Sequence, residues 1–134
     1  MTAVVVETLG LQPFVPSGPD FKIACDFFID LGFTKTWESG DYAGFACGQA
    51  KFILQNYDNP DFAGNLMIRI DVSDLDVWWQ HVSKLDLANK YPNVKLKEPT
   101  NFPWGREVNL IDPAGVCWHI GSPDRRNLSP NPVK

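Results

Sequence analysis

Residues 101–120 read "NFPWGREVNLIDPAGVCWHI" and predict a β-hairpin preceded by an aromatic turn. Two β-prone runs, 106–111 and 116–121, flank an Asp-Pro-Ala-Gly sequence, which is a strong turn signal. Upstream, the Pro-Trp-Gly sequence predicts a second turn that carries Trp104. The second strand carries His119, and the chain has only 2 histidines. The hairpin therefore presents two candidate functional residues, Trp104 and His119.

The residues before this hairpin complete a pattern that occurs twice in the chain. Residues 66–72 alternate between apolar and polar side chains, which predicts a strand, and an apolar stripe at helical spacing follows. The stripe consists of Leu75, Trp78, Trp79, Val82 and Leu85. A strand at 94–98 and the hairpin then give the order β-α-β-β-β. The first half gives the same order, with a strand at 9–17, a helix at 20–32 and strands at 33–37, 41–47 and 50–57.

Serine precedes an acidic residue by three positions at the start of both predicted helices. Ser17 stands before Asp20, and Ser73 stands before Asp76. This spacing is typical of a serine N-cap followed by an acid in the first turn. The two serines are therefore predicted to cap the two helices.

The repeated pattern predicts one α+β domain of two paired β-α-β-β-β modules. The modules occupy about 9–57 and 66–121, the polar run 59–65 predicts a linker, and 122–134 predicts an irregular tail. A chain of 134 residues is long enough to bury one core without disulfides. Each module is expected to be a sheet covered on one side by a helix.

The composition excludes several classes of partner. The net charge is −4, whereas a nucleic-acid-binding protein needs clustered Lys and Arg. No apolar run approaches the length of a membrane span, and the N-terminus lacks the pattern of a signal peptide. We therefore expect a cytoplasmic protein with no nucleic-acid or membrane partner. The cysteines, Cys25, Cys47 and Cys117, are expected to be reduced and buried.

Three segments carry a resemblance to a known family. They are "FPWGREVNLIDPAGVCWHI" at 102–120, "IDLGFTKTW" at 29–37 and "DYAGF" at 41–45. Over about residues 11–121 the chain resembles the bleomycin resistance proteins of the vicinal oxygen chelate superfamily, which also contains glyoxalases and extradiol dioxygenases. The resemblance implies the glyoxalase/bleomycin resistance fold. It also implies a homodimer with clefts between the chains, in which the N-terminal strand is exchanged; Pro13 matches a proline of that strand.

The resemblance also implies aromatic ligand contacts. In bleomycin resistance proteins the residue that matches Trp104 stacks on the flat bithiazole of the drug, opposite an aromatic from the first half of the chain. The matching first-half position here is Tyr42. Those proteins sequester the drug and are not enzymes.

The metal site of superfamily enzymes can be tested slot by slot. By the resemblance, the four ligand slots fall at Met67, Ile53, His119 and within residues 10–13, where Gln12 could offer an oxygen. Divalent metals need several converging nitrogen or oxygen ligands. This set does not supply them, so we predict no metal, no cofactor and no catalytic residue. His119 is then either a partly buried histidine bonded to a neighbour or a residue that orients a ligand.

The remaining ligand-binding candidates lie on the expected concave face. The full predicted set is Trp104, Tyr42, Gly105, Gln55, Met67, Arg69, Asp71 and His119, with Ile53 also facing the cavity. The chain departs from the family at Thr36 and Gly64, where acids are expected, and at Arg69, where an aromatic is expected. Because an arginine attracts carboxylates and repels cations, it argues against bleomycin itself as the ligand. Arg106 and Glu107 are expected to form a structural pair.

The sequence therefore predicts a non-catalytic, dimeric protein that sequesters a bleomycin-type drug or another planar small molecule. Two alternatives remain open. One is a metal-dependent enzyme of the superfamily, similar to glyoxalases, lyases or dioxygenases. The other is a dimer that binds no ligand.

Overall fold

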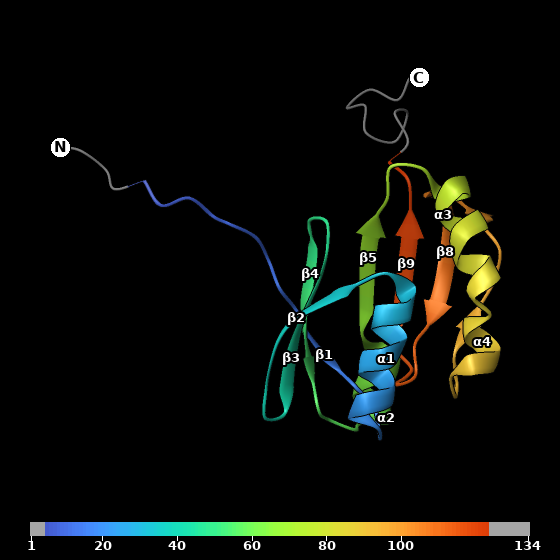
Figure 1. Cartoon of the computed structure of the whole chain (residues 1–134). Coiled ribbons are helices and arrows are strands. Elements are labelled where there is room, and N and C mark those ends of the chain that lie inside the picture. Colours follow the sequence, from blue (N-terminus) through green and yellow to red (C-terminus); the bar gives the residue numbers. More distant parts are fainter. Residues whose placement is uncertain (1–4, 124–134) are drawn as a thin grey trace.

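The computed structural model describes residues 5–123 and shows two modules that follow one another along the chain (Figure 1). The first contains β1 (Phe14–Pro16), α1 (Phe21–Leu31), β2 (Thr34–Ser39), β3 (Tyr42–Cys47) and β4 (Ala50–Gln55). A short helix, α2 (Pro60–Asn65), leads to the second. That module contains β5 (Met67–Asp71), α3 (Leu75–Val82), the 3-10 turn η1 (Ser83–Leu85), α4 (Leu87–Lys90), β6 (Lys95–Leu96), β7 (Thr100–Phe102), β8 (Gly105–Ile111) and β9 (Cys117–Gly121).

Each module builds one mixed sheet, which confirms the predicted α+β class. Sheet A has the order β1-β4-β3-β2, and sheet B has the order β5-β9-β8-β6 with β7 also paired to β8. In both sheets the first strand of the module pairs in parallel with the last one, β1 with β4 and β5 with β9. The other pairings are antiparallel. The two sheets therefore repeat one topology.

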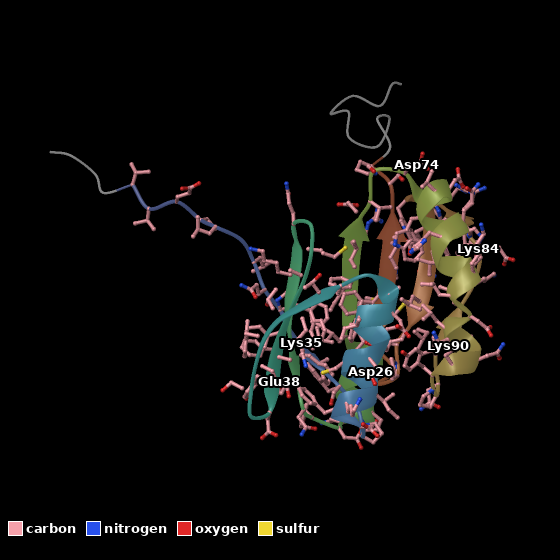
Figure 2. All side chains as sticks on the ribbon, viewed as in Figure 1. Asp26, Lys35, Glu38, Asp74, Lys84 and Lys90 are labelled. Carbon is pink, nitrogen blue, oxygen red and sulfur yellow. The ribbon has the colours of Figure 1, made fainter. Side chains whose placement is uncertain are left out.

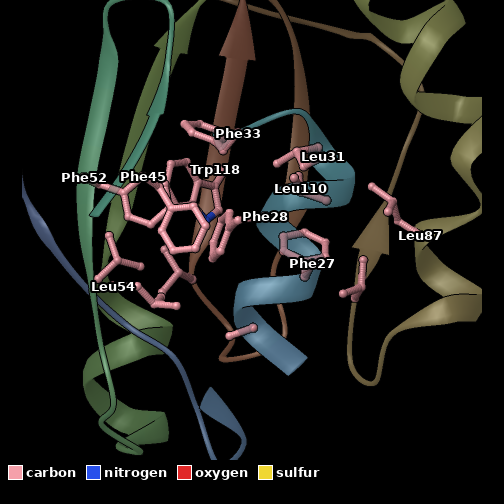
Figure 3. Close-up of a cluster of buried hydrophobic side chains, with 14 of the residues drawn as sticks. Phe27, Phe28, Leu31, Phe33, Phe45, Phe52, Leu54, Leu87, Leu110 and Trp118 are labelled. Carbon is pink, nitrogen blue, oxygen red and sulfur yellow. The ribbon is translucent and has the colours of Figure 1, made fainter. Parts of the chain in front are cut away.

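A shared aromatic core joins the two modules (Figure 3). Phe28 of α1 and Phe52 of β4 both contact the ring of Trp118 on β9, with centroid separations of 5.4 Å and 5.3 Å. Phe28 and Trp118 are 1% exposed, as their predicted core role requires. Charged side chains such as Lys35, Glu38 and Lys90 lie around the outside of the fold (Figure 2). The modules therefore form one core, not two.

The first strand is shorter than the predicted 9–17. Proline has no N–H to give to a ladder, and Pro13 and Pro16 bracket β1. Pro13 contributes only its carbonyl, which accepts from the Ile53 N–H at 2.9 Å. Residues 5–12 are exposed and run away from both sheets (Figure 1). Four large apolar residues of this arm are at least 80% exposed: Val5, Val6, Leu9 and Leu11.

The predicted helix caps were wrong by one to three residues. Asp20, not Ser17, caps α1 by accepting from the Ile23 N–H at 3.0 Å. Asp74, not Ser73, caps α3 by accepting from the Val77 N–H. Ser17 is buried, and its hydroxyl donates to the Gly18 carbonyl while it accepts from the Tyr57 N–H. Its side chain therefore ties β1 to the chain that leaves β4.

Other parts of the sequence-based prediction also need correction. The predicted linker 59–65 holds α2, which Asn59 caps through the Phe62 N–H. The strand β7 was not predicted. Cys47 is exposed, although Cys25 is buried as expected and Cys117 is partly buried. The predicted tail at 122–134 lies almost wholly outside the described residues. Within residues 5–123, no helix is long and apolar enough to cross a membrane.

Candidate functional site

The tight turn between β8 and β9 sets the geometry of the hairpin that carries the site. Asp112 is 1% exposed, and its Oδ1 accepts from the backbone N–H groups of Ala114, Gly115 and Val116 at 2.9–3.0 Å. Its Oδ2 accepts from the Trp118 Nε1–H at 2.9 Å. Burial raises the pKa of Asp112 to about 6, and these four donors oppose that rise. One carboxyl group thus fixes the turn to the aromatic core.

Sheet B has one face turned away from the core, called the open face here. Alternation along the strands and the ladder registers place Met67, Arg69, Asp71, Glu107, Asn109, Cys117 and His119 on it. Cys117 and His119 share this face, as predicted. Burial raises the pKa of the Cys117 thiol, which makes it a poorer nucleophile.

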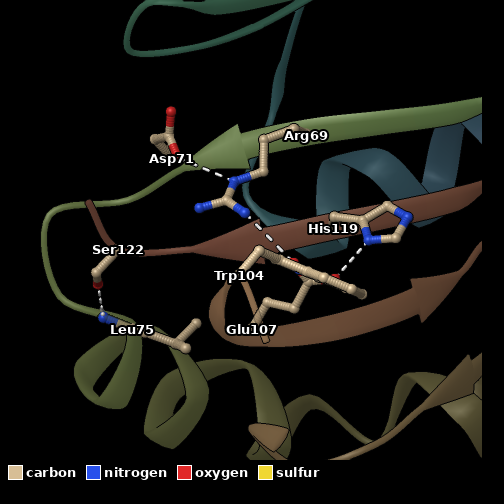
Figure 4. A network of polar contacts seen from close by, with 7 residues as sticks. All are labelled: Arg69, Asp71, Leu75, Trp104, Glu107, His119 and Ser122. Carbon is tan, nitrogen blue, oxygen red and sulfur yellow. Dashed lines mark hydrogen bonds and ion pairs between the residues drawn. The ribbon is translucent and has the colours of Figure 1, made fainter. Parts of the chain in front are cut away.

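Glu107 is the centre of a polar cluster on the open face (Figure 4). Its side chain is 1% exposed, yet both carboxylate oxygens are engaged. Oε1 accepts from Trp104 Nε1 at 2.8 Å and from Arg69 Nη1 at 3.3 Å, and Oε2 contacts His119 Nδ1. A single buried acid therefore positions three of the predicted ligand-binding residues.

The predicted pair between Arg106 and Glu107 was wrong. Neighbouring residues on a strand point to opposite faces of the sheet. Arg106 accordingly points away from the open face and forms an ion pair with Asp76 of α3, with Nη2 and Oδ1 2.7 Å apart. The ionic partner of Glu107 is Arg69.

Arg69 lies between two carboxylates. Besides Glu107, its Nε donates to Asp71 Oδ1 at 3.0 Å. The guanidinium passes over Gly121 so closely that a Cβ on that residue would lie 2.7 Å from Arg69 Nη2. Glycine at this position therefore gives Arg69 its path to the buried acid.

Trp104 is held at the edge of the open face. Its ring stacks on Phe102, with centroids 4.9 Å apart and an interplanar angle of 7°. Gly105 follows it with a φ of 137°, a conformation that favours glycine. The ring is fixed by stacking and by Glu107, yet Trp104 is 58% exposed. It is an ordered aromatic surface that a flat molecule can cover.

A cavity of about 390 Å³ lies beside Trp104 on this face. It is lined by Met67, Ile68, Arg69, Trp104, Glu107 and His119. The structure therefore brings together four predicted residues, namely Trp104, Met67, Arg69 and His119, with Asp71 attached through Arg69. Glu107 and Ile68 are the lining residues that sequence reasoning did not place in the site.

Of the remaining predicted residues, Gly105 begins β8 directly after Trp104, whereas Tyr42 and Gln55 lie on sheet A. They are direct partners in the β3–β4 ladder, and the ring of Phe14 contacts Tyr42 edge-on. Trp37 shares this face because it pairs with Gly44, and its indole lies where a Gly44 side chain would be. Tyr42 and Trp104 thus belong to different sheets of the chain. Trp37 is an exposed aromatic that the sequence analysis did not single out.

A larger cavity of about 490 Å³ lies on the other side of sheet B, between the modules. Its lining includes Leu31, Phe33, Trp78 and Trp118, which belong to or pack against the core. Of the predicted ligand-binding residues it includes only Asp71. Its size alone does not make it the functional site, because the converging polar groups lie on the open face.

The metal slots do not converge in the described part of the chain. Met67 and His119 lie on sheet B, whereas Ile53 lies on sheet A. Among residues 5–123, no group of three or more His, Cys, Asp and Glu side chains is arranged to hold a metal ion. The Glu107–His119 pair supplies only two of the donors that a divalent metal needs. The residues present therefore do not fit the superfamily metal.

Comparison with solved structures shows which fold this geometry has. No family profile and no curated protein sequence matches the chain. Among solved structures, the bleomycin-binding protein of the bleomycin producer Streptomyces verticillus, complexed with copper(II)-bleomycin, has a TM-score of 0.75 at 27% identity, over 90% of this chain and 100% of that one. The chain has the fold of the bleomycin resistance proteins, in the vicinal oxygen chelate superfamily.

Two further structures show how broadly the bleomycin resistance fold is used. An antibiotic-binding protein from Streptomyces sp. CB03234 has a TM-score of 0.68 at 21% identity, covering 91% of this chain and 100% of its own. Lactoylglutathione lyase from Agrobacterium tumefaciens has a TM-score of 0.61 at 17% identity, covering 84% of this chain and 92% of its own. The predicted family resemblance and fold are confirmed. These neighbours support drug binding, and the lyase shows that an enzyme can share the fold.

Proposed function

We propose that this protein binds a small, partly flat drug on the open face of sheet B and sequesters it without chemical change. The observation that carries the proposal is the Trp104 ring, which is exposed beside a cavity but held by Phe102 and Glu107. An aromatic surface fixed in advance loses little entropy when a ligand stacks on it. The bleomycin-binding and antibiotic-binding neighbours support this class of ligand.

The charges of the site support a neutral or cationic ligand. The sequence-based expectation was that Arg69 would repel cations. However, Arg69 is already paired with Glu107 and Asp71, so one cation faces two anions. The cluster carries a net charge of −1 when His119 is neutral. Arg69 therefore gives no reason to exclude a cationic drug such as bleomycin.

Titration with bleomycin tests the proposed function. We expect saturable binding, with a rise of about 2.7 kcal/mol in stability at a hundred times the dissociation constant. Trp104→Ala is expected to weaken binding by roughly tenfold, because stacking and its buried area are lost. Phe62→Ala, which removes an exposed aromatic from α2, should leave the affinity unchanged. Calorimetric titration measures the bleomycin affinities of wild type and the two variants. Unaltered affinity in Trp104→Ala would contradict the stacking role.

The same proposal includes a homodimer. Tyr42 and Trp37 on sheet A can oppose Trp104 across a ligand if they come from a second copy. The arm of residues 5–12 exposes large apolar side chains that a partner could cover, which supports exchange of the N-terminal strand. Analytical ultracentrifugation should therefore find a dimer, and Leu9→Asp with Leu11→Asp should weaken it. A monomeric wild-type protein that still binds bleomycin would refute this arrangement.

A metal-dependent enzyme of the superfamily is the alternative function. The lyase neighbour, which shares the fold, favours it as a second candidate. Metal analysis of the purified protein distinguishes the two functions. Near-stoichiometric Zn, Ni, Mn or Fe would overturn the proposal of a purely binding protein.

A further inference from the structure

Two polar atoms near the centre of the open face are buried without a protein partner. They are Nε2 of His119 and Oδ1 of Asn109, neither of which is hydrogen-bonded within the described residues. The two residues are direct partners in the β8–β9 ladder, so their side chains share one face. Buried polar atoms are hydrogen-bonded in the great majority of proteins. This pair therefore requires a partner from outside the described chain.

Asn109 Oδ1 is an acceptor, and His119 Nε2 is an acceptor in the neutral form of the ring. The Glu107 carboxylate contacts Nδ1 of His119, and an ionised carboxylate can only accept, so the proton of the neutral ring lies on Nδ1. Nε2, on the other side of the ring (Figure 4), then carries a lone pair. The amide oxygen of Asn109 is also an acceptor. Glu107 thus sets the hydrogen-bonding character of His119 as well as its position.

We propose that His119 Nε2 and Asn109 Oδ1 receive an N–H or O–H donor of the ligand, which makes the ligand an aromatic amide, amidine or amine and not a carboxylate. This inference rests on the proposed function, since it takes the open face as the ligand site. A carboxylate would set its lone pairs against two acceptors and near the charge of Glu107. Arg69 offers it little compensation because two protein carboxylates already engage that guanidinium.

The path to these atoms runs through the cavity beside Trp104. His119 lines that cavity, with 22% of its side chain exposed. Nε2 itself is covered, so a ligand must shift a neighbouring side chain to reach it. Met67, an unbranched residue that lines the same cavity and is 69% exposed, can move at low cost. The donor preference is therefore expected to appear as a difference in affinity between matched small probes.

Four flat probes of similar size test the proposal. Benzamidine and benzamide carry N–H donors, methyl benzoate carries only acceptors, and benzoate is anionic. We expect benzamidine and benzamide to bind roughly tenfold more tightly than methyl benzoate and benzoate. The reason is that a ligand without a donor leaves the two protein acceptors without hydrogen bonds, which costs affinity. With ¹⁵N-labelled histidine, the Nε2 resonance of His119 should move with the donors only. Equal affinity for benzamide and methyl benzoate, or no binding of any probe, would overturn the inference.

Asn109→Val supplies the matched variant. Replacing an amide whose buried oxygen has no protein partner by an apolar residue of strand-forming type should leave the free protein as stable as wild type or more so. The ratio of benzamide to methyl benzoate affinity should fall towards one. Asn101→Val changes an exposed residue of β7 on the opposite face of sheet B and should leave the ratio unchanged.

Three results would count against the inference. If Asn109→Val keeps the full ratio, the donor is received elsewhere. If a crystal structure with benzamide shows a water molecule retained between the two acceptors, the ligand does not satisfy them. If bleomycin binds but the probes show no donor preference, the inference fails while the proposed function stands. If neither bleomycin nor any probe binds, the proposed function is overturned too.

Discussion

Glu107→Leu is expected to destabilise the protein by about 3–5 kcal/mol, the usual cost of removing one partner of a buried ion pair. The change leaves Arg69 without its buried acid, and it leaves Trp104 Nε1 and His119 Nδ1 without their acceptor. Glu107→Gln keeps an oxygen for Trp104 but loses the charge, and its amide N–H₂ would face His119. We expect a smaller loss of about 1–3 kcal/mol for it.

Urea unfolding of the two variants beside wild type measures these losses. Glu38→Gln is the matched control, because it removes a carboxylate from an exposed ion pair with Lys35. Exposed pairs contribute about 0–1 kcal/mol, so the control should stay close to wild type. If Glu107→Leu were no more destabilised than Glu38→Gln, Glu107 would not hold the cluster together.

Glu107→Gln should also change the ligand preference of the site. With one of its two carboxylates removed, Arg69 retains charge that an anionic molecule can use. The affinity for benzoate should therefore rise relative to the affinity for benzamidine. A merely loosened structure would instead bind both probes more weakly. A uniform loss of affinity for all probes would indicate that Glu107 acts through stability alone.

The sequence was informative about the modules because their signals are local. Alternation in 66–72 and the stripe on Trp78 and Trp79 predicted β5 and α3 within a few residues. The helix α2 was missed although Asn59 followed by Pro60 is a recognised helix start. The low apolar content of 59–65 concealed it.

The site was less predictable because it depends on strand parity and on tertiary contacts. Counting alternate residues along β8 excludes a pair between Arg106 and Glu107, and it places Glu107 and Asn109 on the face of the sheet that carries His119. Trp37 escaped this method because the register of β2 shifts between Lys35 and Trp37. Such a bulge changes which face a side chain takes, and nothing in the local residues announces it.

The separation of Tyr42 from Trp104 has a different origin. Tyr42 begins β3, and Trp104 lies in the turn before β8. The spacing of residues along the chain does not show how the two sheets are placed relative to each other. That relation arises from how whole sheets are placed, and here it assigns the two aromatics to different sheets. A two-chain site is the arrangement in which both can still contact one ligand.

Asp112→Ala is the second change with a large expected effect, a loss of about 3–5 kcal/mol. It leaves three backbone N–H groups of the hairpin turn and the Trp118 Nε1–H without an acceptor. Each unsatisfied buried donor costs about 1–3 kcal/mol, although water can reach part of the opened turn. Asp112→Asn, which keeps Oδ1 but turns an N–H₂ towards Trp118, should lose less. Chemical denaturation, followed by the near-ultraviolet circular dichroism of the aromatic side chains, measures both losses.

The pH dependence of the Asn variant separates burial from hydrogen bonding. Burial raises the pKa of Asp112 to about 6 in the folded protein, whereas its ordinary value is 3.8. Between these values the folded state binds the proton more readily than the unfolded state, so the contribution of Asp112 to stability falls as pH rises from about 4 to about 6. Asp112→Asn has no such titration. The stability advantage of wild type over Asp112→Asn should therefore shrink across that window, by on the order of 3 kcal/mol. An advantage that instead grew with pH would mean that the four donors outweigh burial and that the turn is built to hold a carboxylate anion.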